Sequence, residues 1–249
     1  MGQYYTALVI DENNTIKKLD PHEFNSFSKL WEHAWIGNKF VNAVYSLIHN
    51  RPRKVAWIGD YSRDFYEEVS RAGDGDFDLS KAPTEPDLRD IFPGLKADKP
   101  PRREISVSWI KALPFKSFSR LYQVAWGNKK SMKSSDFTSR QLNLVNVYTK
   151  GMYLVNHDLK CYLDMAQYIL RSLKEDSECA ISCFDPLPLL TACGNGLGNG
   201  DYEGKSCIED VGTWAFHRIE YTDRIPEGYS EKEYCFFEER DTCTTVITL

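Results

Sequence analysis

The chain has 249 residues, of which 42% are hydrophobic and 13% aromatic, and it carries a net charge of −5. This size and composition allow a substantial core in one large or two small domains and exclude an intrinsically disordered protein. The acidic balance argues against a nucleic-acid or anionic-membrane partner. No apolar run approaches the roughly 20 residues of a membrane span, and the N-terminus lacks a signal peptide, so a cytoplasmic location is expected.

The first segment predicts a hairpin followed by a capped helix. Tyr4–Ile10 is rich in strand-forming residues, and Thr15–Leu19 can return as its antiparallel partner. Asp20 followed by Pro21 is typical of a helix start, with Asp20 as the N-cap. The next apolar residues recur at helical spacing and predict one buried helix face: Phe27, Leu30, Trp31, Ala34 and Trp35.

A second helix is expected at Phe40–Ile48, and a short buried strand at Lys54–Ile58 ends in Gly59-Asp60-Tyr61. The composition then changes to Pro, Asp, Gly and Lys from Gly73 to Arg103, which indicates a surface excursion or linker. The later predictions are strands at Ile105–Ile110, Ala180–Phe184 and Trp214–Tyr221, a hairpin of Met152–Val155 with Lys160–Leu163, and helices at Asp64–Ser70, Phe115–Trp126 and Ala166–Leu173.

These elements mix without regular strand–helix alternation. The sequence therefore predicts an α+β fold with a mixed, mostly antiparallel sheet and flanking helices. The expected organisation is an N-terminal hairpin and helices over residues 1–72, an excursion or linker over 73–103, and a C-terminal sheet-containing part over 104–249. The alternative is a single domain over 1–249.

Four alternating glycines make residues 186–204 the most informative stretch of the chain: Gly194, Gly196, Gly198 and Gly200. Glycine loses more conformational entropy on folding than any other residue, so such a cluster indicates positive φ angles or a close approach by another molecule. Backbone N–H groups there could form a nest for an anion such as phosphate. The spacing matches neither a dinucleotide fingerprint nor a Walker loop, and a tight structural turn is the alternative.

Two Gly-Asp-Tyr triplets place Asp60 and Asp201 after compact apolar segments. Paired carboxylates could hold a metal or share acid–base work, with His217 as general base, or each could simply cap a turn. No metal-ligand spacing is evident among the seven cysteines, and their odd number without an export signal predicts reduced thiols. The residues predicted to contact a ligand are Tyr61, Cys193, Gly194, Asn195, Gly196, Gly198, Asn199, Gly200, Tyr202 and Trp214.

Several motifs resemble a family of uncharacterised bacterial and phage proteins. They are the Met-Gly-Gln-Tyr-Tyr start, the hairpin from Tyr153 to Asp164, the glycine-rich loop from Leu189 to Tyr202, and Val211-Gly-Thr-Trp. The resemblance implies an intracellular protein from a bacterium or mobile element. It also implies an acidic residue where this chain has His217.

Two functions follow as hypotheses. The first is an intracellular binding protein that holds a partner protein or a small anionic ligand at the glycine-rich loop, such as a phage inhibitor of a host defence. The alternative is a metal-assisted hydrolase of a nucleotide or phosphodiester that uses Asp60, Asp201 and His217. Short basic clusters at Arg51–Lys54 and Lys129–Lys133 would support a nucleic-acid binder, the hypothesis that the acidic total disfavours most.

Overall fold

The computed structural model describes residues 3–72, 110, 112–175, 183–194, 210–234 and 236. The predicted excursion over residues 73–103 lies outside this part of the chain, as does nearly all of the predicted strand over Ile105–Ile110. Within the described ranges, no helix combines the length and the apolarity needed to cross a bilayer.

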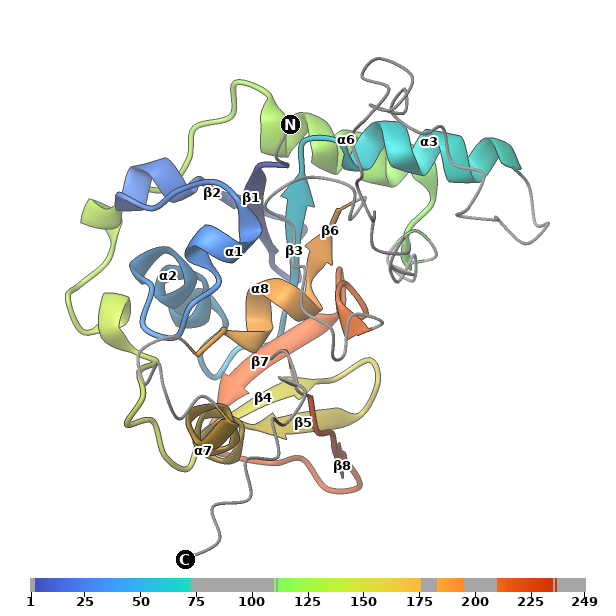
Figure 1. Ribbon diagram of the computed structural model, residues 1–249. Helices are drawn as coiled ribbons and strands as arrows, with labels where there is room; N and C mark the ends of the chain where they lie inside the picture. Colours follow the sequence, from blue (N-terminus) through green and yellow to red (C-terminus); the bar gives the residue numbers. More distant parts are fainter. Residues whose placement is uncertain are drawn as a thin grey trace, which may run out of the picture.

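One mixed sheet of eight strands organises the described residues (Figure 1). The strands are β1 (Tyr5–Ile10), β2 (Ile16–Leu19), β3 (Arg53–Gly59), β4 (Tyr153–Asn156), β5 (Cys161–Asp164), β6 (Ala192–Cys193), β7 (Arg218–Thr222) and β8 (Ser230–Glu231). Their order is β2-β1-β3-β7-β4-β5-β8, with β6 also paired to β3. The β3–β6 and β5–β8 pairs are parallel and the others antiparallel, which confirms the predicted α+β class.

Strand β3 is the centre of the sheet because three strands pair with it. From Lys54 to Gly59 it runs antiparallel to β1. Its other edge is shared: β7 pairs at the start, where Lys54 lies opposite Arg218, and β6 pairs at the end, where Ile58 lies opposite Cys193. The chain between β6 and β7 therefore leaves and rejoins the sheet along one edge of β3.

Helices cover both faces of β1 and β3. The described helical segments are η1 (Pro21–Phe24), α1 (Leu30–His33), α2 (Lys39–Ile48), α3 (Ser62–Ala72), α6 (Phe115–Trp126), η3 (Ser134–Asp136), η4 (Gln141–Asn143), α7 (Met165–Glu175) and α8 (Pro186–Leu190). Helices α2, α7 and α8 contribute to one hydrophobic cluster, and α3 and α6 contribute to the second. Figure 1 shows α3 and α6 side by side at one end of β3, away from α2 and α8.

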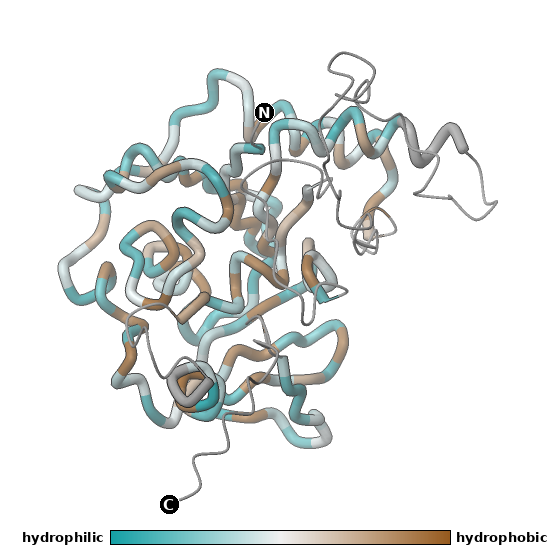
Figure 2. Tube along the Cα trace, in the orientation of Figure 1, coloured by the Kyte–Doolittle hydropathy of each residue, from teal (hydrophilic) through white to brown (hydrophobic). Residues whose placement is uncertain are grey.

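Alternation along β3 explains these two layers. Val55 and Trp57 belong to the first cluster, whereas Ala56 and Ile58 belong to the second, as the twofold period of a strand requires. All four side chains are at most 1% exposed. A strand buried on both faces must be apolar throughout, which is why β3 has a continuous apolar run. Figure 2 shows the hydrophobic residues concentrated along the central strands.

Two predicted elements are shorter than their sequence patterns indicated. Asp20 caps η1 as expected, because its carboxylate accepts from the His22 amide at 3.0 Å. However, the predicted helix face from Phe27 to Trp35 yields only α1, and Phe27 is 71% exposed. The predicted strand from Trp214 begins only at Arg218, because Phe216 adopts a left-handed φ of 65° that interrupts an extended chain.

Candidate functional site

The parallel pairing of β3 with β6 brings the first Gly-Asp-Tyr triplet to the root of the glycine-rich loop. Asp60 and Tyr61 follow the end of β3, and Gly194 follows the end of β6. Because Ile58 lies opposite Cys193, both segments leave the sheet at the same edge. Asp201 and the other predicted ligand contacts from Asn195 to Tyr202 lie outside the described residues.

The glycine at this root is explained by packing within the protein. A Cβ atom on Gly194 would collide with the Tyr5 hydroxyl and would lie 3.0 Å from Oε1 of Gln3. A Cβ on Gly59 would likewise collide with the Gln3 side chain and lie 3.0 Å from the Cys193 carbonyl oxygen. At position 194, therefore, neighbouring side chains require glycine without any ligand.

Asp60 has a structural role in the sheet edge. Its Oδ1 accepts a hydrogen bond from the Tyr4 amide at 3.0 Å, and its own amide donates to the Tyr4 carbonyl at 3.0 Å. Its carbonyl oxygen accepts from the Tyr122 hydroxyl at 2.6 Å. Burial raises the pKa of the Asp60 carboxyl, and the Tyr4 amide partly offsets this. The neighbouring Tyr61 provides the carbonyl that accepts from the Phe65 amide at the start of α3.

Cys193 and Trp214 lie inside the core. Each side chain is 0% exposed. Burial raises the pKa of the Cys193 thiol well above its usual value, which suppresses the reactive thiolate. The Trp214 indole donates to the Tyr234 hydroxyl at 3.0 Å, so its one donor is satisfied within the protein. The structure places neither predicted ligand contact at a surface that a ligand could reach.

His217 lies at the opposite end of β3 from Asp60. It precedes Arg218, which pairs with Lys54 near the start of β3, whereas Asp60 follows the end of that strand. Six residues separate Lys54 from Asp60, a distance of about 20 Å in an extended strand. The structure therefore does not bring these two predicted catalytic residues together. Burial lowers the pKa of His217, and its Nδ1 accepts a hydrogen bond from the side-chain Nδ2 of Asn156 at 3.0 Å.

A basic pocket lies elsewhere, between β2, the end of α2, the start of β3 and the segment around η3 and η4. It has a volume of about 420 Å³. Its basic side chains are those of Lys17 on β2 and of His49, Arg51 and Arg53, which span the turn between α2 and β3. Asn50 allows this sharp turn, because it adopts a left-handed φ of 53° and its amide donates to the Tyr221 carbonyl at 2.9 Å.

The cations of the basic pocket have no carboxylate partner within 4 Å among the described residues. Burial lowers the pKa of the Lys17 ammonium, and the charges of Arg53 and Arg51 lower it further, whereas the nearby Asp11 carboxylate raises it and partly offsets the shift. Nη1 of Arg53 is shielded from solvent and has no acceptor within the described part of the chain. Asp136 is the acidic residue of the lining, and its Oδ2 already accepts from the Lys133 amide at 2.8 Å.

Sequence reasoning identified part of this pocket and connected it only with the disfavoured nucleic-acid-binding hypothesis. The cluster Arg51–Lys54 is a short basic run, the kind that usually forms a solvated face. The spacing of the basic residues is the sequence feature that could have indicated the pocket. Arg51 and Arg53 are two positions apart, so their side chains lie on the same side of an extended segment, and that of Lys54 lies on the other side. The approach of Lys17 depends on the β1–β3 pairing, which no local pattern contains.

A divalent metal has no evident site in the described ranges, where no three His, Cys, Asp or Glu side chains are grouped to hold one. The three described cysteines, Cys161, Cys183 and Cys193, are free and buried. Comparison of the chain with protein-family models, curated proteins and solved structures finds no match, so a function can be argued only from the residues themselves.

Proposed function

We propose that the protein is a binding protein for a small anionic ligand and that the basic pocket holds the anion. The observation that carries this proposal is the convergence of Lys17, Arg51 and Arg53 on one cavity, where none of them has a carboxylate within 4 Å among the described residues. Three like charges held close together repel one another, and the repulsion is strongest where burial removes water. A bound anion would offset the repulsion among these three cations.

Phosphate is the anion that fits these groups best. Two guanidinium groups offer forked N–H donors that match phosphate oxygens, and an ammonium adds a point charge. The volume of about 420 Å³ is larger than a phosphate ion alone needs and falls within the usual range of small-molecule pockets. Leu47, Met132 and Phe137 supply an apolar side to the lining. The expected ligand is therefore a small organic phosphate.

The original hypothesis placed an anion or a host partner at the glycine-rich loop. That contact stays a prediction, because residues 195–209 lie outside the described part. The described residues do not favour the hydrolase alternative, since Asp60 and His217 lie at opposite ends of β3, while Asp201 lies outside the described part. Binding of an anion is the function that the described residues favour.

Isothermal titration calorimetry with inorganic phosphate and pyrophosphate tests the proposal. Arg53→Gln should weaken binding by about tenfold or more, because one charge-assisted hydrogen-bond partner is lost. Lys54→Gln is the matched control, because it removes the same charge one residue along β3 but outside the pocket lining. The wild-type protein should bind pyrophosphate less tightly in 0.5 M salt than at low salt, because dissolved ions screen the attraction between the anion and the pocket's cations.

Two outcomes would overturn the proposal. The first is the absence of binding by either phosphate probe at low salt. The second is equal weakening by Arg53→Gln and Lys54→Gln, which would indicate a diffuse charge effect in place of a defined pocket. Thermal unfolding of both variants shows whether the fold is retained.

A further inference from the structure

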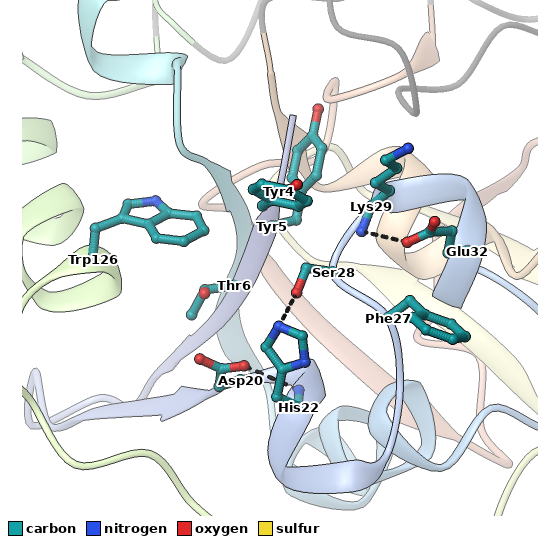
Figure 3. Close-up of a pocket in the computed structure, with 10 residues that line it drawn as sticks. All are labelled: Tyr4, Tyr5, Thr6, Asp20, His22, Phe27, Ser28, Lys29, Glu32 and Trp126. Carbon is teal, nitrogen blue, oxygen red and sulfur yellow. Dashed lines mark hydrogen bonds between the residues drawn. The ribbon is translucent and has the colours of Figure 1, made fainter. Parts of the chain in front are cut away.

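A second cavity is lined by aromatic rings and shares no lining residue with the basic pocket. It has a volume of about 380 Å³ and lies between the start of β1, the segment from η1 to α1, and the end of α6. Figure 3 shows Trp126 on one side of this aromatic pocket and Phe27 on the opposite side, with Tyr4 between them. The three rings come from segments that are far apart in the sequence.

The aromatic pocket is unusual because its rings are left in contact with solvent. Tyr4 is 47% exposed and Phe27 is 71% exposed, while Trp126 is half-buried. Trp31, which precedes the lining residue Glu32, is 46% exposed. Exposed aromatic side chains gathered in one place mark interaction sites more often than isolated ones do. Phe27 lies before α1, and Trp31 lies within α1 but not among its buried residues, which are Leu30 and His33.

Charge around the aromatic pocket is net acidic. Asp20 and Glu32 both line it, and each uses one carboxylate oxygen to accept a backbone amide, from His22 at 3.0 Å and from Lys29 at 3.2 Å. The second oxygen of each carboxylate makes no hydrogen bond to another described residue. The lining has one ammonium, Lys29, whose side chain Figure 3 shows extending away from Asp20.

Two polar side chains of the pocket floor, Ser28 and His22, are already paired, whereas Nε1 of Trp126 has no partner among the described residues. The Ser28 hydroxyl and Nε2 of His22 lie 2.7 Å apart and satisfy each other. The Ser28 carbonyl accepts from the Tyr5 amide at 2.8 Å, which fixes the floor to β1. A ligand would therefore be recognised mainly by the ring faces and the carboxylates.

We propose that the aromatic pocket binds an organic cation, such as a quaternary ammonium or guanidinium group. The negative faces of Tyr4, Phe27 and Trp126 attract a large, weakly hydrated cation, and the carboxylates of Asp20 and Glu32 add charge complementarity. A neutral aromatic ligand would contact the aromatic side chains but would gain nothing from the carboxylates. An anion would be repelled here, so the selectivity is opposite to that of the basic pocket, and the two proposals are independent.

Choline and its neutral isostere 3,3-dimethylbutan-1-ol distinguish these ligands, because they share a shape and differ in charge. Calorimetric titration should show choline binding about tenfold more tightly than the neutral compound, in keeping with the strength of cation–π contacts. Phe27→Leu should weaken choline binding severalfold and leave the fold intact, because the ring is 71% exposed. Tyr148→Leu is the control, since Tyr148 is 84% exposed and lies outside the pocket lining.

Asp20→Asn tests the carboxylate separately. Asparagine is an equally good N-cap, so η1 should persist while the charge is lost, and choline affinity should fall by about threefold to tenfold. Equal affinity for choline and the neutral isostere would overturn the proposal in favour of a merely apolar pocket. Failure of choline, tetramethylammonium and guanidinium all to bind would overturn it outright. Pyrophosphate binding at the basic pocket should be unchanged in every one of these variants.

Discussion

Cys193 illustrates how a residue next to a distinctive loop can still be inert. It directly precedes Gly194, yet it is 0% exposed and burial raises the pKa of its thiol. In the native protein at pH 8, iodoacetamide should modify Cys193 at least about 100-fold more slowly than in urea, because reaction requires local opening. Peptide mass spectrometry after timed labelling measures the ratio. Equal rates in both conditions would contradict the buried placement.

Asp185 is the carboxylate that sequence reasoning missed. It caps α8 by accepting from the Leu187 amide at 3.0 Å, and it accepts from the Tyr45 hydroxyl at 2.8 Å. Its burial is nearly complete, and its pKa rises to about 7 as a result. The sequence Asp185-Pro186 predicts a helix cap but does not predict that the carboxylate is buried. Tyr45 is 140 residues away, so its approach depends on the tertiary fold.

At the scale of elements, regular local patterns predicted structure well. The hairpin β1–β2, the hairpin β4–β5 and helix α2 lie close to where alternation and helical spacing placed them. The predictions of short elements were less accurate, because tertiary contacts determine where such elements form. The parallel pairing of β3 with β6 involves strands more than 130 residues apart, and α1 has too few residues for its apolar spacing to define a buried face.

The β3–β6 junction is the element whose close packing predicts a clear mutational effect. Gly59→Ala should destabilise the protein by about 1–3 kcal/mol, because the added methyl group meets Gln3 and the Cys193 carbonyl in a packed interior. Urea unfolding measures the change. Gly151→Ala is a useful comparison, because a Cβ there meets nothing within 4 Å, although its φ of 62° adds backbone strain.

The comparison separates the two causes. A loss at Gly59 larger than the loss at Gly151 supports the packing argument, because Gly59 carries no positive-φ strain. If Gly59→Ala were neutral, the junction would have to accommodate a methyl group, and the close approach of β1, β3 and β6 would be wrong. The same junction sets the direction in which the glycine-rich loop leaves the sheet.

For the whole molecule, two buried titrating groups on the α2 side of the sheet have opposite effects on the pH dependence of stability. His33 is 0% exposed; its Nδ1 donates to the Phe27 carbonyl at 3.0 Å and its Nε2 accepts from the Trp57 indole at 3.1 Å. Burial lowers its pKa from 6.5 to about 4, whereas burial raises that of Asp185 from 3.8 to about 7. Both groups are therefore uncharged in the folded protein near pH 5.

The signs of the two effects on stability are opposite. Between about pH 4 and 6.5, unfolding protonates His33, so its contribution to the free energy of unfolding increases as the pH rises. Between about pH 4 and 7, unfolding releases the Asp185 proton, so its contribution decreases as the pH rises. Each slope is at most about 1.4 kcal/mol per pH unit. The two should largely cancel in the wild-type protein.

Removing either group should expose the slope of the other. In Asp185→Asn, the amide oxygen can still accept from Leu187 and Tyr45, and stability relative to wild type should rise with pH across this window. In His33→Gln, which offers one donor and one acceptor, stability relative to wild type should fall with rising pH. Urea unfolding from about pH 4 to pH 7 gives the difference profiles, in which all other groups cancel. Flat profiles for both variants would show that neither group is held uncharged by the fold, and parallel slopes of the same sign would contradict the opposed arrangement.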